Sequence, residues 1–311
     1  MGRASLVLVA GALLSLAPAH AQATYAPPRT ADGHPDLQGV WAGHFMTELE
    51  RPDDVKDLIV PADQAAGVIA KLTWKPEGVY DPDVDYFMPD TLLSVSGTLR
   101  SSWIVEPGDG RLPITALAKA ALKHSEDLSE FGFDNPEERP TPERCVTGLG
   151  YPPLHDISIV IPYLIVQTPG AIVVASEDTD PARIIHMTGP APPEVIRTRA
   201  GYSAGHWDGD TLVVETTHIS ADDPSGVLDR GGVVLARGSR VTERFTLHSN
   251  TELLYQFTVE DPSFYHQPWR AEFVLKRLDG RVYEYACHEG NRGMVGILTA
   301  ARLGRQETRK K

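Results

Sequence analysis

Glu243 is the residue whose setting most suggests chemistry, because it is an acid on the apolar face of a predicted β-hairpin. The hairpin runs through residues 241–247 and returns through residues 253–259. Side chains of a strand alternate between its faces, so Glu243 shares a face with Phe245 and Phe257. A carboxylate that faces a hydrophobic interior is costly to bury and needs a partner or a function. We expect either a structural acid bonded to a buried Arg or Tyr, or a general acid or base.

Glu284 and His288 are the next candidates for catalysis. Residues 271–277 and 282–287 are predicted to form the last hairpin, around a turn at Asp279-Gly280. With a two-residue turn, Glu284 and His288 share a face with Phe273 and the other apolar residues of that hairpin. An acid and an imidazole in different environments can divide the two halves of a proton transfer. The alternative is a cluster of hydrogen bonds at the rim of the sheet.

Five further residues are predicted to contact a ligand or substrate. Tyr255 shares the apolar face of Glu243, and Trp269 ends a loop whose aromatic residues could form a lid. His206 belongs to a hairpin whose two faces each carry both apolar and polar side chains. The alternative to a binding role is therefore an ordinary surface or core histidine. Asn291 could equally cap the C-terminal helix. The predicted binding residues are Tyr255, Tyr285, His206, Trp269 and Asn291.

Several mechanisms lack their sequence signatures. The chain has no G-x-S-x-G elbow, no P-loop and no G-x-G-x-x-G after a strand, which argues against an ordinary α/β-hydrolase and against a bound nucleotide. The 11 histidines are scattered without metal-ligand spacing, so only convergence in space could build a metal site. We therefore expect neither a metal nor an organic cofactor.

The elements that must position these residues are mostly strands. Before residue 156 the chain is irregular and rich in Pro, Asp and Gly, with short helices predicted over residues 61–72 and 113–124. After residue 156 the apolar period becomes two, and sequential hairpins with short turns follow. This pattern predicts a mainly β fold: an antiparallel meander closed into a lipocalin-like barrel or a sandwich, with a few peripheral helices. Residues 24–155 would form an irregular N-terminal layer and residues 156–311 the barrel with a C-terminal helix, all within one structural domain.

The N-terminus is typical of an exported protein. Arg3, an apolar stretch over residues 6–16 and the small-residue sites at residues 19–23 form a signal peptide, predicted to span residues 1–23. Removing it takes away Arg3, its single charged residue, and changes the formal charge from −13 to −13 − 1 = −14. An acidic chain without a basic cluster is a poor partner for nucleic acid, and no later apolar run could span a membrane. We expect a periplasmic or secreted protein.

Cys145 and Cys287 are the only cysteines of the chain. In an oxidising compartment an even pair favours a disulfide. The alternative, a zinc site of Cys and His, lacks any C-x-x-C or H-E-x-x-H spacing.

Three long segments carry a resemblance to a known family. They are DGHPDLQGVW at residues 32–41, GHWDGDTLVV at residues 205–214 and YEYACHEGN at residues 283–291. Together they resemble a family of exported proteins found widely in Gram-negative soil and aquatic bacteria, over nearly the whole mature chain. That family has no established reaction, so the resemblance implies export and not an activity. The Gly-x-Trp triplets at Gly39 and Gly205 are also similar to those of lipocalin-like barrels.

The sequence thus favours an exported, cofactor-independent enzyme that acts by acid–base chemistry on a small organic molecule, as a lyase, isomerase or hydrolase. Glu243 and His288 would exchange protons, and Glu284 would orient or polarise the substrate. A periplasmic small-molecule binding or carrier protein is the alternative, and a structural envelope protein is the third. The sequence is silent on oligomeric state.

Overall fold

The computed structural model describes residues 25–72, 90–141, 143–146, 148, 150–155, 162–177, 182–221, 228–230, 233–284 and 286–308. The predicted signal peptide and Tyr285 lie outside these described residues. None of the helices in the described ranges is long and apolar enough to cross a membrane.

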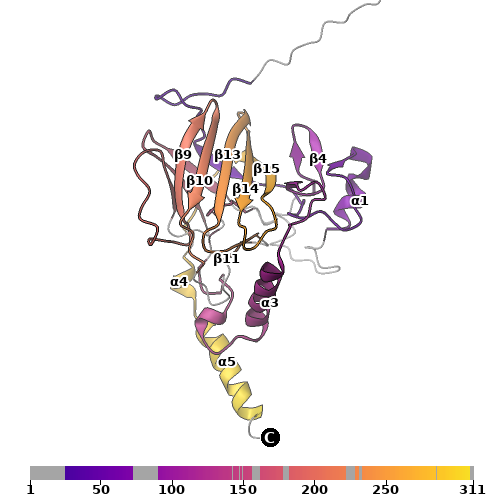
Figure 1. Cartoon of the computed structure of the whole chain (residues 1–311), viewed down its shortest axis with the longest axis vertical. Coiled ribbons are helices and arrows are strands. Elements are labelled where there is room, and N and C mark those ends of the chain that lie inside the picture. Colours follow the sequence, from indigo (N-terminus) through magenta and orange to yellow (C-terminus); the bar gives the residue numbers. More distant parts are fainter. Residues whose placement is uncertain are drawn as a thin grey trace, which may run out of the picture.

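A closed barrel of nine strands forms the centre of the molecule (Figure 1). The order of strands around it is β1-β6-β7-β8-β9-β10-β13-β14-β15, and β1 pairs with β15 to close the ring. Its strands are β1 (Gly39–Ala42), β6 (Tyr163–Gln167), β7 (Ala171–Ser176), β8 (Arg183–His186), β9 (Tyr202–Asp208), β10 (Thr211–Thr217), β13 (Arg240–Ser249), β14 (Glu252–Glu260) and β15 (Trp269–Leu278). The predicted mainly β barrel is confirmed.

The barrel departs from the predicted meander in two respects. Strand β9 runs parallel to β8, because residues 187–201 carry the chain back before it re-enters the sheet. Strand β1 comes from the part of the chain predicted to form the N-terminal layer, but it lies in the barrel and pairs there with both β6 and β15. The barrel is therefore mixed and draws on both halves of the chain.

The predicted returning strand over residues 282–287 is wrong. Residues 281–284 are irregular, and residues 287–290 form a short helix, α4 (Cys287–Gly290). The edge of β15 that this strand would need is occupied by β1, whose Trp41 lies opposite Arg277. Near its start, β15 also pairs with the short strand β5 (Ile104–Glu106). Because the register of the last hairpin no longer applies, Glu284 and His288 are exposed rather than inward-facing.

Short elements surround the barrel (Figure 1). Beside it lies a small lobe of strands β2 (Ile59–Val60), β3 (Ser94–Val95) and β4 (Thr98–Arg100) with helices η1 (Ala62–Gln64) and α1 (Ala65–Ile69). Below it in the figure lie strands β11 (Leu228–Arg230) and β12 (Val233–Leu235) and helices α3 (Ala116–Phe131), η2 (Pro136–Glu138), α4 and α5 (Gly293–Thr308). All three predicted helices are present, although α3 extends seven residues beyond its predicted end at residue 124.

Large side chains fill the barrel interior, and the N-terminal segment lies across one of its ends. The largest fully buried side chains include Trp41, Trp269, Tyr163, Tyr255, Phe245, Phe257 and Phe273. At the end formed by the β9–β10 turn, the ring of His34 stacks on Trp207 with centroids 4.9 Å apart, and Arg29 pairs with Asp210 at 2.7 Å. Two of the segments that carry the family resemblance therefore meet in space at this end.

Candidate functional site

Glu243 lies inside the barrel in a fully buried ion pair. Strand β13 turns it inward, opposite Phe257 of β14 and Val214 of β10, and its side chain has no solvent exposure. Arg183 of β8 reaches across and donates from Nη1 to Oε1 at 2.9 Å and from Nη2 to Oε2. The inward register predicted for Glu243 is therefore present, and its charge is matched by a cation.

Two further donors of Arg183 are also used inside the barrel. Its Nε donates to Oγ of Ser203 at 3.0 Å, and its Nη2 donates to Oγ1 of Thr216 at 3.1 Å. The two hydroxyl oxygens lie 2.8 Å apart. Because buried charges are stable only when they are paired and hydrogen-bonded, this arrangement is typical of a structural network.

Tyr255 extends the network towards the segment that precedes β6. Its hydroxyl donates to Oε1 of Glu243 at 2.8 Å and accepts from the backbone N–H of Leu154 at 2.8 Å. Burial, and then the nearby charge of Glu243, raise the pKa of Tyr255 well above its usual value. The hydroxyl therefore stays protonated and acts as a donor to Glu243. With both carboxylate oxygens engaged, Glu243 has the partners expected of a structural acid.

Trp269 also lies inside the barrel, in contact with other aromatic rings. The rings of Phe257 and Tyr265 meet it edge to face, each with a centroid 5.5 Å away. The indole N–H groups of Trp41 and Trp103 donate to backbone carbonyls, whereas the buried Nε1 of Trp269 has no hydrogen-bond partner in the described structure. Trp269 is a core side chain with one unsatisfied donor.

The other predicted site residues lie outside the barrel interior. His206 is exposed on the outer face of β9, because its neighbours Gly205 and Trp207 take the inward positions. His288 and Glu284 are exposed in and before α4. The structure therefore brings Glu243 and Tyr255 together, but it does not bring His288 or Glu284 to them.

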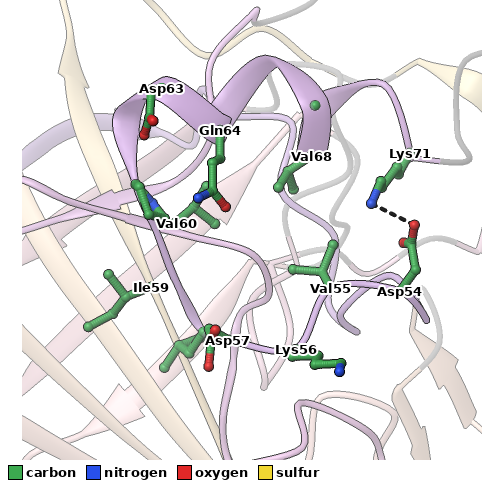
Figure 2. Close-up of a pocket in the computed structure, with 13 residues that line it drawn as sticks. Asp54, Val55, Lys56, Asp57, Ile59, Val60, Asp63, Gln64, Val68 and Lys71 are labelled. Carbon is green, nitrogen blue, oxygen red and sulfur yellow. Dashed lines mark ion pairs between the residues drawn. The ribbon is translucent and has the colours of Figure 1, made fainter.

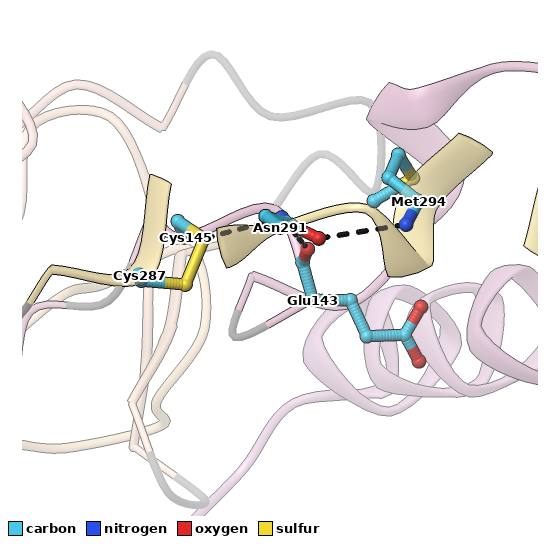
Figure 3. The surroundings of a disulfide bond; sticks show 5 residues. All are labelled: Glu143, Cys145, Cys287, Asn291 and Met294. Carbon is cyan, nitrogen blue, oxygen red and sulfur yellow. Dashed lines mark hydrogen bonds between the residues drawn. A yellow bond between two sulfur atoms is a disulfide. The ribbon is translucent and has the colours of Figure 1, made fainter. Parts of the chain in front are cut away.

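Asn291 supports the disulfide and the start of α5 (Figure 3). Cys145 and Cys287 form the predicted disulfide, with Cα atoms 5.6 Å apart. Asn291 Nδ2 donates to the carbonyl of Glu143 at 2.8 Å and contacts Sγ of Cys145 at 3.2 Å, while its Oδ1 accepts from the N–H of Met294 at 3.4 Å. Asn291 thus has the capping position considered from the sequence.

Arg183 and His155 are among the buried polar residues that the sequence analysis does not predict. Arg183 shares the parity of Ile185 on β8, a signal that places it on the inward face. His155 is buried beside Trp103, with ring centroids 5.2 Å apart, and burial lowers its pKa to about 4. A lone histidine after a Pro-rich segment carries no periodic pattern, so no sequence signal pointed to it.

A pocket of about 750 Å³ opens outside the barrel, between the segment that leads into β2 and helices η1 and α1 (Figure 2). Pro61 directly precedes η1, and its φ of −58° is the value that a helix start requires. The helix returns over the strand, so that Val60 and Val68 form a buried apolar floor with the half-buried Val55. The volume lies within the range of small-molecule sites in proteins, roughly 300–1,000 Å³.

Charged side chains form the rim of this pocket. They are Asp54, Lys56, Asp57, Asp63 and Lys71, all of them exposed. Lys71 Nζ pairs with a carboxylate oxygen of Asp54 at 2.5 Å, and this hydrogen bond holds the pKa of Asp54 below its usual value. Three carboxylates and two ammonium groups leave a formal charge of −3 + 2 = −1. An apolar floor beneath a slightly negative rim suits a ligand with an apolar body and a cationic group.

Comparisons with known proteins show no relative of this chain from which a function could be taken. The chain matches no family model, and no curated protein or solved structure matches it. Within the described ranges, no three His, Cys, Asp or Glu side chains gather in a way that could hold a metal ion.

Proposed function

We propose that the protein is an exported small-molecule-binding protein that holds its ligand in the pocket between residues 54 and 71. The observation that carries this proposal is the pocket itself: about 750 Å³, a floor that includes Val60 and Val68, and a charged rim. Ligand sites combine an apolar lining with a few polar groups that fix orientation. The barrel serves as the rigid support.

Binding fits the geometry better than acid–base catalysis by the residues first considered. The Glu243 carboxylate has no solvent exposure and is hydrogen-bonded by Arg183 and Tyr255. His288, its expected counterpart, is exposed outside the barrel. A proton transfer needs the acid, the base and the substrate within hydrogen-bond reach of one another.

The ligand class follows from the rim. With Lys71 paired to Asp54, the carboxylates of Asp57 and Asp63 remain, and these two residues line the pocket from different sides (Figure 2). A small amine with an aliphatic or aromatic body would place its cation between these two carboxylates and its body on Val55, Val60 and Val68.

Mass spectrometry of ligand carried by the purified protein tests the proposal. The protein is incubated with a small-molecule extract of the producing organism, separated from unbound material and denatured. Gly67 lines the pocket, and nothing lies within 4 Å of a Cβ added there, so the Gly67→Phe variant adds a bulky ring at the pocket without a clash. Gly170→Phe is the matched control, because Gly170 is also unobstructed but lies in the β6–β7 turn.

We expect an amine recovered unchanged from the native protein and from Gly170→Phe, and at least about tenfold less from Gly67→Phe, the ratio that corresponds to about 1.4 kcal/mol of binding free energy. Equal recovery from Gly67→Phe would overturn the pocket as the site. A ligand that returns with altered mass would overturn binding in favour of catalysis, and the absence of any ligand would overturn both.

The proposal of export has separate support. The charged, apolar and small-residue regions of residues 1–23 are those of a signal peptide, and the Cys145–Cys287 disulfide suits an oxidising compartment. Cell fractionation with N-terminal sequencing tests it. We expect a periplasmic or secreted chain that begins at Gln22 or Thr24, directly after one of the two small-residue sites. A cytoplasmic chain that begins at Met1 would contradict export.

A further inference from the structure

Strand β2 forms an open edge of the small lobe, at the pocket that is proposed to hold the ligand. The order of the three-stranded sheet is β2-β4-β3, so among the described strands β2 has a neighbour on one side only. Both of its residues, Ile59 and Val60, line the pocket. An edge strand with free backbone groups is a place where an extended peptide can add a further strand.

The register of β2 shows which backbone groups point to this open edge. Ile59 lies opposite Arg100, whose own N–H donates away from β2, to the carbonyl of Leu93 at 2.8 Å. One position before Ile59, the carbonyl of Leu58 accepts from the N–H of Ser101 at 2.9 Å. Hydrogen-bonded and non-hydrogen-bonded pairs alternate in an antiparallel ladder, so Ile59 and Arg100 form a non-hydrogen-bonded pair. The N–H and C=O of Ile59 therefore point to the open edge.

The backbone just before Ile59 is held from inside the lobe. Arg51 Nη1 donates to the carbonyl of Lys56 at 2.5 Å, and Ser101 Oγ donates to the carbonyl of Asp57 at 2.7 Å. Arg51 and Ser101 are 3% and 0% exposed, so these contacts lie beneath the surface. Ile59 differs from these positions, because within the described residues its N–H and C=O have no partner and its side chain is 56% exposed. The open edge is thus presented by a fixed segment.

The polar side chains of the pocket match the groups of a short peptide. Lys71 pairs with Asp54, whereas Lys56, Asp57 and Asp63 form no ion pair within the described part of the chain. Figure 2 shows Asp63 and Lys56 on opposite sides of the pocket. The carboxylates suit an N-terminal ammonium group, and the ammonium group of Lys56 suits a C-terminal carboxylate. Gln64, which also lines the pocket, can both donate to and accept from a peptide group.

We propose that the ligand is a short apolar peptide with both ends free, which adds to the edge of β2 as a further strand. The inference rests on the binding pocket proposed above and narrows its ligand from an amine to a peptide. The backbone of the peptide would pair with the N–H and C=O of Ile59, and its apolar side chains would pack on the floor of the pocket. Its N-terminus would lie at Asp63 or Asp57 and its C-terminus at Lys56.

Isothermal titration calorimetry of the full mature protein with synthetic peptides tests the proposal. The probes are trileucine, its N-acetylated and C-amidated forms, trileucine methylated on its central peptide nitrogen, and isoamylamine as an amine without a peptide backbone. Trileucine should bind most tightly, and each change that removes an end charge or the backbone donor should raise the dissociation constant by at least about tenfold.

Variants of Lys56 separate recognition of the carboxylate from a general loss of binding. Lys56→Gln should bind trileucine and its C-amidated form with equal affinity, whereas Lys56→Arg should keep the difference between them. Lys119→Gln is the matched control, because Lys119 is an exposed lysine on α3, and it should behave like the native protein. A Lys56→Gln variant that still prefers the free carboxylate would overturn the role of Lys56.

The outcomes distinguish the peptide from the pocket on which the inference rests. Isoamylamine that binds as tightly as trileucine, and no longer binds to Gly67→Phe, would overturn the peptide and leave the pocket as a site for amines. Trileucine that binds Gly67→Phe as it binds the native protein would also overturn the inference, as would equal affinity for trileucine and its N-methylated form. If the native protein binds neither probe, the peptide is excluded, and the ligand recovered from the cell extract decides on the pocket alone.

Discussion

Arg183 and Glu243 meet inside the barrel although their strands, β8 and β13, are separated in the sheet by β9 and β10. Their side chains are 1% and 0% exposed. The pair therefore spans four strands and fixes their relative positions from within. Tyr255 adds a fifth strand, β14, through its hydrogen bond to Glu243.

Glu243→Gln should lower the free energy of unfolding by about 3–5 kcal/mol, because removal of one partner leaves a buried charge without compensation. Urea unfolding followed by fluorescence measures the change. The double variant Arg183→Met/Glu243→Leu removes both charges and should recover most of the loss. A single variant within about 0.5 kcal/mol of the native protein, the range of an ordinary surface change, would contradict a structural role.

Acid should destabilise the protein through His155. Its pKa is about 4 in the folded chain, against an ordinary value of 6.5 that applies once the chain unfolds, so between these values the unfolded state binds the extra proton. The neutral imidazole makes its full contribution to the free energy of unfolding above pH 6.5. That contribution is lost as the pH falls towards 4, and the total loss is about 3 kcal/mol. In His155→Gln this part of the pH dependence should be missing from urea-unfolding measurements at several pH values. Parallel profiles for the two proteins would contradict the assignment.

The buried tryptophans Trp103 and Trp269 should respond differently to loss of the indole N–H. Trp103 donates to the carbonyl of Thr47, whereas Trp269 has no partner in the described structure. Trp103→Phe should lower the free energy of unfolding by about 1–3 kcal/mol more than Trp269→Phe does, because only the first substitution leaves a buried carbonyl without a donor. Thermal unfolding by calorimetry compares the two. A larger loss in Trp269→Phe would indicate that its N–H has a partner in solution.

Gly39 should not tolerate a side chain. Its φ is +131°, and an added Cβ would lie 2.3 Å from Nη1 of Arg277. That guanidinium donates to the carbonyl of Gln38 at 2.8 Å and lies 4.2 Å from the ring centre of Trp41, so it cannot move without losing both contacts. Gly39→Ala should lower the free energy of unfolding by about 1–3 kcal/mol. Gly170→Ala, at an unobstructed turn position, should change it by less than about 0.5 kcal/mol.

Reduction of the disulfide should destabilise the protein. Cys145 and Cys287 are 142 residues apart, and closing so long a loop contributes about 4–5 kcal/mol by loss of chain entropy in the unfolded state. Urea unfolding with and without dithiothreitol measures the loss. The Cys145→Ser/Cys287→Ser variant should match the reduced protein and show no further response to the reductant. If the variant and the oxidised protein unfold together, the cross-link does not stabilise the chain.

The sequence predicted local features well and distant pairings poorly. Glu243 was placed inward correctly because period two holds without interruption from Val241 to Leu247, and the one irregularity of that hairpin lies beyond it. Glu284 was misplaced because β1, more than 230 residues upstream, pairs with the edge of β15 that a returning strand would have used. No local pattern reports such a pairing. The pocket between residues 54 and 71 was missed for a similar reason, since it depends on how a short helix returns over a short strand.

The position of β1 has a consequence for the order in which the chain can fold. Gly39–Ala42 leaves the ribosome early, yet its two neighbours are β6 and β15, and β15 ends at Leu278. The barrel therefore cannot close until nearly the whole chain has been synthesised. Until then, the edge of β1 that pairs with β15 stays open, and another chain could add a strand there. A partner that holds the chain unfolded until synthesis is complete would remove that hazard, and translocation across a membrane in an extended state would do the same.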